Sequence, residues 1–217
     1  MKMIRQLFPL AIGGIALGST EFIPMGLMRT MGGDLHLSDD QVGNFIAAYA
    51  IGVVVGAPTL VGLSTRFQPK KVLIAFMLLF TLFNGLFSLM PTYETLLVSR
   101  FCSGLPHGAF FGVGAIVAKQ LAPREKEAMA ISVMFGGLTI ANLLVIPLFT
   151  HLGGVIGWRP VVAMIAALGL VTALCVFFFL PKVDSQRDMT LWKELQHFFS
   201  IPSMLLLVIT ALGCGGL

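Results

Sequence analysis

Long apolar stretches dominate the chain and predict its secondary structure. A membrane-spanning helix needs ~20 mostly apolar residues, and six stretches qualify: about 7–28, 42–63, 72–90, 95–118, 128–150 and 160–180. A seventh begins near Ser203 and is still apolar at Leu217, where it covers only ~22 Å of a ~30 Å bilayer core. The pattern predicts an all-α polytopic membrane protein, with a six-helix bundle over residues 1–181 and the truncated start of a seventh helix over 203–217.

The segment between the sixth and seventh stretches, residues 182–202, follows a different pattern. Apolar side chains recur at helical spacing and polar ones lie between them, the apolar set being Leu191, Trp192, Leu195, Phe198 and Phe199. This pattern is typical of an amphipathic helix on the cytoplasmic membrane surface. An ordinary linker with scattered aromatic residues is the alternative. Six spans, a polar connector and a further span together predict two helical bundles joined in the middle.

Composition agrees with a membrane protein and excludes other classes. Hydrophobic residues make up 57% of the chain and charged residues only 11%, against about 25% charged in soluble domains. The formal net charge is +4, but the basic residues are spread through short loops, so we expect no nucleic-acid partner. The cysteines lie in apolar segments without metal-ligand spacing, and we expect neither a metal site nor a cofactor.

The basic residues also predict the orientation of the spans. Arg29 and Arg159 fall on one side and Arg100 within a span, whereas the other eleven of the fourteen Lys and Arg residues share the opposite side. Cytoplasmic loops carry the excess of Lys and Arg, so we expect a cytoplasmic N-terminus. The eleven residues are Lys2, Arg5, Arg66, Lys70, Lys71, Lys119, Arg124, Lys126, Lys182, Arg187 and Lys193.

Three ionisable residues lie inside predicted spans: Glu21 in the first, and Arg100 and His107 in the fourth. A charged residue at the helix centre costs ~2.5–3.5 kcal/mol on insertion scales, so each one suggests a function. Glu21 lies ~10 Å from the outer end of the first predicted helix, and Arg100 lies ~8 Å from the outer end of the fourth. The two opposite charges are therefore expected at similar depth, where they could pair beside a water-filled cavity.

His107 follows Arg100 by two helical turns and shares its face near mid-membrane. There it could relay protons or donate to a substrate. The structural alternative is that His107 bonds a neighbouring helix or the carbonyl that Pro106 leaves free. Asn142, near the middle of the fifth span, is a further candidate for substrate contact, whereas the remaining polar residues are expected to form hydrogen bonds between helices: Thr20, Asn44, Tyr49, Asn84 and Thr139.

Three stretches carry a resemblance to a known family. "GSTEFIPMGLM" with "GDLHLSDDQVGNFIAAYAIGVVVGAP" resembles helices 1 and 2 of bacterial exporters, including the acidic Glu21. "RFCSGLPHGAFFGVGAIVA" resembles their helix 4 signature, whose arginine is Arg100 here, and "GGLTIANLLVIP" before "GWRP" resembles their helix 5 antiporter motif. The chain is identified as a member of the major facilitator superfamily, within the drug:proton antiporter group, similar to bacterial sugar (arabinose-type) efflux and chloramphenicol-resistance permeases.

The resemblance covers the N-terminal half of such a transporter and implies a bundle of 3+3 repeats. It implies a helix 2–3 loop motif at Arg66, Lys70 and Lys71, and a helix 5 motif at Gly137, Asn142 and Pro147. The sequence departs from both motifs. Thr65 and Gln68 replace the aspartate and a glycine of the loop, and Val145 and Phe149 stand where glycine is usual in helix 5.

These features favour a secondary exporter of the bacterial inner membrane, in which proton entry drives the efflux of small molecules by alternating access. In this hypothesis Glu21 carries the proton, Arg100 is its charge partner, and His107 and Asn142 contact the cavity. The expected partners are a small-molecule substrate, protons, the bilayer and a C-terminal half of the same transporter. The alternative is a truncated fragment that does not transport. An enzyme is not expected, because the sequence has no set of catalytic residues on one face. The absence of a phosphate loop argues against an ATP-driven pump.

Overall fold

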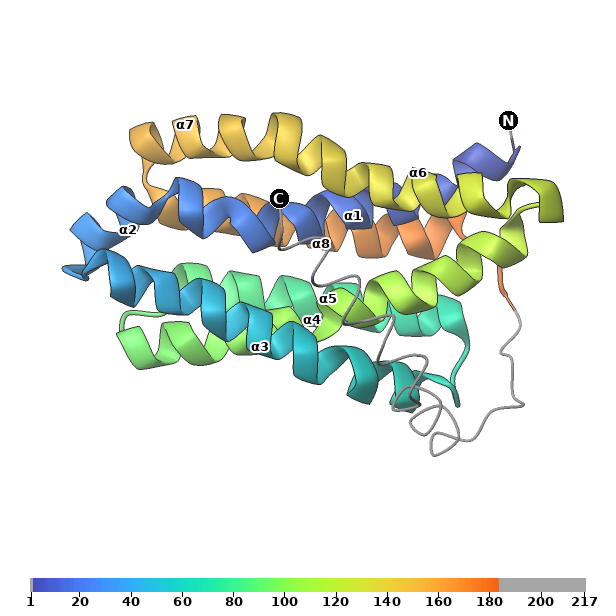
Figure 1. Cartoon of the computed structure of the whole chain (residues 1–217), viewed down its shortest axis with the longest axis horizontal. Coiled ribbons are helices and arrows are strands. Elements are labelled where there is room, and N and C mark those ends of the chain that lie inside the picture. The colour runs from blue at the N-terminus through green and yellow to red at the C-terminus, as the bar shows by residue number, and fades with distance from the viewer. Residues whose placement is uncertain (1, 184–217) are drawn as a thin grey trace, which may run out of the picture.

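The computed structural model describes residues 2–183, which are helical almost throughout and contain no β-strand. Figure 1 shows the helices lying side by side along one direction, as an elongated bundle. The elements are α1 (Lys2–Gly26), α2 (Met28–Leu35), α3 (Asp39–Ser64), α4 (Pro69–Leu89), α5 (Tyr93–Leu121), the 3₁₀ turn η1 (Arg124–Lys126), α6 (Glu127–Ile140), the π-helical turn η2 (Ala141–Val145), α7 (Ile146–Ile156) and α8 (Trp158–Phe179).

The predicted all-α fold with six spans is confirmed. Six helices or continuous helical runs are long and apolar enough to cross a membrane, and each overlaps one predicted span. Two spans differ in detail. The first ends at Gly26 and is followed by the short α2, and the fifth runs from Arg124 to Ile156 through a π-helical turn. Apart from Lys182 and Val183, the predicted linker and seventh helix lie outside the described residues.

The π-helical turn η2 has a local cause in the sequence. Pro147 has no backbone N–H, so the carbonyl of Leu143 loses its normal helical partner. The neighbouring Ile146 N–H bonds the carbonyl of Ala141, five residues back, which is the π-helical pattern. The bulky residues at Val145 and Phe149 therefore do not prevent an irregular fifth span.

Residues at the helix ends stop and start the spans. Ser38 and Gln41 form a capping box at the start of α3, where each side chain accepts a backbone hydrogen bond from the other residue. Pro69 opens α4, and the Thr92 hydroxyl accepts from the Thr95 N–H at the start of α5. Gly157, between α7 and α8, has φ 87°, a conformation that favours glycine.

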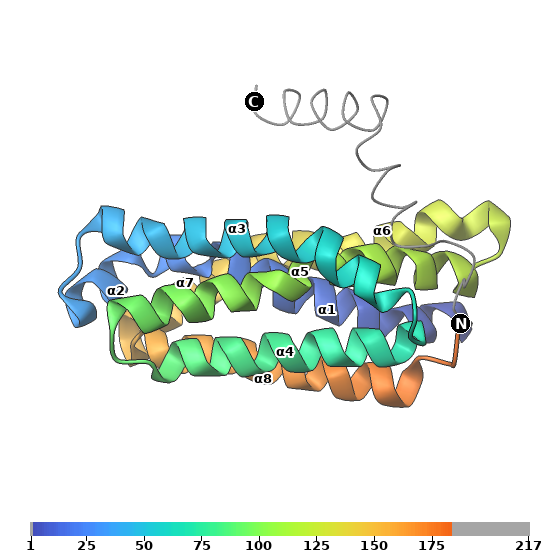
Figure 2. The same ribbon diagram turned by 90° about the horizontal axis from the view of Figure 1, so that it is seen from below.

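The helix packing repeats itself in two halves. The most extensive contacts join α3 to α5, α4 to α8, α4 to α5, α1 to α6 and α1 to α8. In this set α5, the α6–α7 run and α8 of the second half correspond to α1, α3 and α4 of the first half. The α3–α5 contact then corresponds to the α1–α6 contact, the α4–α5 contact corresponds to the α1–α8 contact, and the α4–α8 contact corresponds to itself. The packing is therefore that expected of 3+3 repeats, and Figure 2 shows the α4–α8 pair along one side of the bundle.

Glycines allow the closest helix approaches in both halves. A Cβ atom on Gly56 of α3 would overlap the backbone of Leu105 in α5, and a Cβ on Gly137 of α6 would overlap the backbone of Ala11 in α1. The small-xxx-small pairs of α3 and α5, Gly52 with Gly56 and Gly104 with Gly108, lie at this contact. Backbones that touch so closely place the polar groups of α1, α3 and α5 within reach of one another.

The helices α4 and α8 cap each other at both ends of the bundle. Lys70, the second residue of α4, donates from Nζ to the carbonyl of Leu180 at 2.6 Å, where α8 ends. Arg159, the second residue of α8, donates from Nη1 to the carbonyls of Ser88 and Met90 at 3.1 and 2.9 Å, where α4 ends. Each basic side chain supplies a donor and a positive charge to the C-terminus of the antiparallel partner.

This arrangement separates the three basic residues that the family resemblance groups in one loop motif. Lys70 is half-buried against α8, whereas Arg66 and Lys71 are exposed. At the other end of the bundle, Asp34 supports the cap that Arg159 forms on α4. It accepts a hydrogen bond from Trp158 Nε1 at 2.9 Å and pairs with Arg159 Nε at 3.5 Å.

We expect Lys70→Met to destabilise the bundle and Lys71→Met to leave it nearly unchanged. Loss of a basic side chain at a helix C-terminus costs about 0.3–1 kcal/mol, and up to ~2 kcal/mol in a half-buried site. Thermal unfolding of the purified chain in detergent would measure the difference. Equal midpoints for the two variants would contradict the assigned cap.

Candidate functional site

Arg100, two turns into α5, is fully buried, with 1% of its surface exposed. Its guanidinium donates from Nε to the Phe45 carbonyl at 3.3 Å, from Nη1 to the Thr20 hydroxyl at 3.2 Å and from Nη2 to the Thr20 carbonyl at 3.1 Å. These acceptors come from α1 and α3. A charge buried at this depth is tolerated only where such groups replace water.

The Thr20 carbonyl is available to Arg100 because of the sequence of α1. In a regular α-helix this carbonyl would accept a hydrogen bond from the N–H of residue 24. Residue 24 is a proline, which has no N–H. The proline therefore leaves an unpaired acceptor in the membrane interior, and Arg100 supplies the missing donor.

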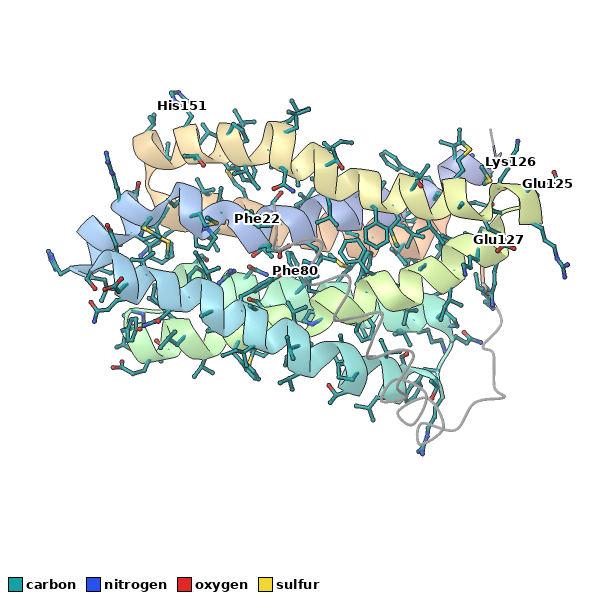
Figure 3. The ribbon with its side chains drawn as sticks, in the orientation of Figure 1. Phe22, Phe80, Glu125, Lys126, Glu127 and His151 are labelled. Carbon is teal, nitrogen blue, oxygen red and sulfur yellow. The ribbon has the colours of Figure 1, made fainter. Side chains whose placement is uncertain are left out.

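Aromatic rings and an amide complete the surroundings of Arg100. Its Cζ lies 4.4 Å from the ring centre of Tyr49 and 5.3 Å from that of Phe87, distances that allow cation–π attraction. The Thr20 hydroxyl donates in turn to the Asn84 side chain, which donates to the Phe80 carbonyl at 2.9 Å. Figure 3 labels Phe80 midway along the bundle. The cluster thus joins α1, α3, α4 and α5.

Glu21 does not contact Arg100 directly, which corrects the expected ion pair. Within the described residues 2–183, the carboxylates that lie within 4 Å of a basic nitrogen are Glu21, beside His107, and Asp34, beside Arg159. The two residues nevertheless lie at a similar level of the bundle, because Arg100 binds Thr20, the residue before Glu21. Successive residues on an α-helix point about 100° apart, so α1 cannot direct both side chains at one guanidinium.

Glu21 instead approaches His107. The distance from its Oε2 to His107 Nε2 is 3.8 Å, and 35% of the Glu21 side chain is exposed against 11% for His107. The other ring nitrogen, Nδ1, lies 2.7 Å from the Tyr49 hydroxyl. His107 therefore connects α5 to both α1 and α3, and its ring nitrogens do not bond the carbonyl that Pro106 leaves free.

The helix 5 candidates lie apart from this cluster. Asn142 is exposed and donates from Nδ2 to the Leu138 carbonyl in its own helix at 3.0 Å. Gly137 is buried against α1, and Pro147 lies at the start of α7. In the part of the chain that the structure describes, no hydrogen bond or ion pair joins Asn142 to Glu21, Arg100 or His107.

Sequence reasoning missed the roles of Thr20, Tyr49 and Asn84 in the site. All three stood out as polar residues in apolar spans and were expected to bond between helices, which they do. That Tyr49 bonds His107 rather than another polar residue depends on the packing of α3 against α5. Over residues 2–183, no three His, Cys, Asp or Glu side chains lie close enough together to hold a metal ion.

Comparison with known proteins identifies the family. The family model described as the Major Facilitator Superfamily matches residues 10–217. The chain belongs to this superfamily of transporters. The relatives include "Inner membrane transport protein YdhP" of Escherichia coli K12, which is 40% identical over 217 residues, and "Putative transporter AraJ" of the same organism, 36% identical over 215 residues. The matches cover 100% and 99% of this chain but 56% and 54% of the relatives, so the chain spans about half their length.

Solved structures share the superfamily fold. The proton:xylose symporter XylE bound to 6-bromo-6-deoxy-D-glucose superposes with a TM-score of 0.74 at 16% identity, over 94% of this chain and 50% of that chain. A partially occluded inward-open form of XylE from E. coli gives a TM-score of 0.73 at 15% identity, over 99% and 60%. Together with six membrane-length helices, these matches establish the fold as that of one six-helix superfamily bundle.

We expect Arg100→Lys to destabilise the chain although it keeps the positive charge. A lysine ammonium cannot reproduce the planar fork that reaches Thr20 and Phe45 together, and the loss of hydrogen bonds to a charged group predicts a cost of about 2–3 kcal/mol. Arg29→Lys, at an exposed position of α2, is the matched control. Thermal unfolding in detergent would compare the two, and equal stability would refute the structural role of the guanidinium.

Proposed function

We propose that the chain forms one wall of a secondary transporter of the bacterial inner membrane, which exports small molecules in exchange for protons. The observation that carries this proposal is the partly exposed Glu21 inside a membrane-length helix, one residue after Thr20, which binds the fully buried Arg100. An acidic group at that depth is stable only beside water or other polar groups. The exposed part of Glu21 therefore faces the transport pathway.

Glu21 is the better proton carrier of the cluster. Arg100 keeps its proton at all physiological pH values, and three of its N–H groups bond Thr20 and Phe45. It acts as a fixed positive charge near Glu21. Glu21 can bind a proton from one side and release it on the other as the two bundles of the transporter rock about the central site.

The helix 5 residues have a separate role in the proposal. The π-helical turn at Ala141–Val145 gives the fifth span a place to bend, since the backbone pattern there is already irregular. Gly137 keeps that span in contact with α1 on one side of the turn, and on the other side Pro147 leaves the Leu143 carbonyl without its helical partner. Asn142 is exposed at the turn and is proposed to contact the substrate.

The substrate is proposed to be a sugar or a drug-like molecule. Support comes from the resemblance to sugar and chloramphenicol exporters and from the fold shared with XylE, which is described as a proton:xylose symporter. A second six-helix bundle would supply the other wall of the cavity. Relatives that continue beyond the matched half are consistent with such a partner.

The orientation is proposed from the distribution of charge. Glu125, Lys126 and Glu127, in and just after η1, lie at the end where α1 begins and where α3 meets α4, whereas His151 lies at the opposite end, as Figures 1 and 3 show. Arg66, between α3 and α4, and Lys71, in the first turn of α4, are exposed. Basic loops favour the cytoplasm, so this end is proposed to face inward.

Single cysteines in a variant without native cysteines would test this orientation in whole cells. A cysteine at Gly33, in α2, should react with a membrane-impermeant maleimide, whereas one at Gln120 should react only after the cells are opened. The reverse pattern would invert the proposed topology. Both positions are exposed, so access of the reagent depends on the side of the membrane.

We expect Glu21→Gln, in the transporter that contains this chain, to lower proton-driven efflux at least tenfold. The amide keeps the size of the side chain but cannot carry the proton. The assay would follow efflux of sugars and antibiotics from an exporter-deficient bacterial host with and without a proton gradient. Glu125→Gln, exposed near η1, is the matched control, and Asn142→Ala should change substrate preference rather than proton dependence.

Two results of this assay would refute the mechanism. Unchanged efflux in Glu21→Gln would remove the proposed proton carrier, and efflux that persists without a proton gradient would remove proton coupling. The alternative function, a chain that does not transport by itself, is decided when the 217-residue chain is expressed alone in the same host. Efflux by the chain alone would refute that alternative.

A further inference from the structure

The ring of His107 is held in one orientation by its neighbours. Tyr49 approaches it edge-on, with ring centres 5.7 Å apart and planes at 83°, and Phe111 packs on it at 5.3 Å. The Tyr49 hydroxyl lies 2.7 Å from Nδ1. Only 2% of Tyr49 and 9% of His107 is exposed. A ring flip would replace Nδ1 by a carbon and break the only hydrogen bond that the Tyr49 hydroxyl makes among the described residues.

The direction of that hydrogen bond follows from what else the Tyr49 hydroxyl can reach. Within residues 2–183 the hydroxyl has no hydrogen-bond partner other than His107. If Nδ1 carried a proton, it would donate to the hydroxyl oxygen, and the hydroxyl proton would be buried without an acceptor. Buried polar groups are rarely left unpaired. The tyrosine must therefore donate and Nδ1 accept, which puts the proton of the neutral ring on Nε2.

We propose that Tyr49 is a positioning residue that fixes His107 as the Nε2–H tautomer, so that His107 is a hydrogen-bond donor toward Glu21 and not a carrier of protons. Nε2 is the nitrogen 3.8 Å from the Glu21 carboxylate, and the two form a hydrogen bond if the partly exposed Glu21 side chain rotates toward it. With its proton already on Nε2 and its Nδ1 lone pair used by Tyr49, the ring has no free site for a transferred proton.

The consequence for coupling rests on the proposed function. A proton arriving from water forms an O–H bond on the Glu21 carboxylate, and no bond at His107 forms or breaks. The Nε2–H contact is charge-assisted while Glu21 is ionised and neutral once Glu21 is protonated, and charge-assisted bonds are roughly twice as strong. Protonation of Glu21 therefore loosens a contact between α1 and α5, and His107 converts a proton-binding event into a change in helix packing.

No other charged group competes for His107. Arg100 lies on α5 itself, and α1 and α3 contribute Glu21 and Tyr49. The remaining charged residues of the helices packed against α5 lie near helix ends, namely Lys2, Arg5, Asp39, Asp40, Lys70, Lys71 and Glu127, and those of α5 are Glu94 and Lys119.

Nitrogen-15 NMR of the histidine side chains would test the tautomer in the 217-residue chain in phospholipid nanodiscs. The chain has four histidines, and His107→Gln assigns the resonances of His107. Protonated and unprotonated ring nitrogens resonate far apart, and an unprotonated nitrogen shifts further when it accepts a hydrogen bond. We expect His107 with Nε2 protonated and Nδ1 unprotonated and hydrogen-bonded.

Tyr49→Phe should move the Nδ1 resonance to that of a nitrogen without a hydrogen bond. Tyr93→Phe is the matched control, because the chain has only two tyrosines and Tyr93 bonds the exposed Asn44 instead. A protonated Nδ1 in the unmodified chain would overturn the proposal even if Tyr49→Phe failed to fold, and an unchanged Nδ1 resonance in folded Tyr49→Phe would do so as well. Neither result depends on efflux, so the tautomer and the transport mechanism can fail separately.

Discussion

The arrangement of this bundle depends on how the buried charge of Arg100 is satisfied. Two of its three hydrogen-bond acceptors are backbone carbonyls, of Thr20 in α1 and Phe45 in α3. Backbone acceptors are available only if the helices lie at the right distance and rotation, so the guanidinium constrains whole helices rather than single side chains. Pro24 adds to this constraint, because it leaves the Thr20 carbonyl without a partner inside α1.

Because of the same constraint, the neighbouring residues Thr20 and Glu21 have different contacts. Thr20 turns toward Arg100, and Glu21 therefore points about 100° away, toward His107 and the exposed face. One side of α1 thus holds the helices together while the adjacent side keeps a titratable group accessible. The charge of Arg100 lies close to Glu21, but the guanidinium does not bond the Glu21 carboxylate, which therefore stays open to a proton.

The polar cluster breaks a symmetry that the rest of the bundle keeps. The close helix contacts at Gly56 and Gly137 correspond between the two halves, as do the caps made by Lys70 and Arg159. The ionisable residues do not correspond, since α1 carries Glu21 whereas its counterpart α5 carries Arg100 and His107. Packing thus follows the repeat, and the proposed chemistry follows the differences between the repeats.

The sequence by itself determined the membrane-spanning class, the six spans, the three intramembrane ionisable residues and the similar depths of Glu21 and Arg100. These follow from composition and from the fixed rise of an α-helix. The tertiary structure decided which side chains meet. Glu21 pairs with His107 instead of Arg100, and Lys70 caps α8, because contacts between helices depend on their rotation and on close approaches at glycine. Neither can be derived from spacing along one helix.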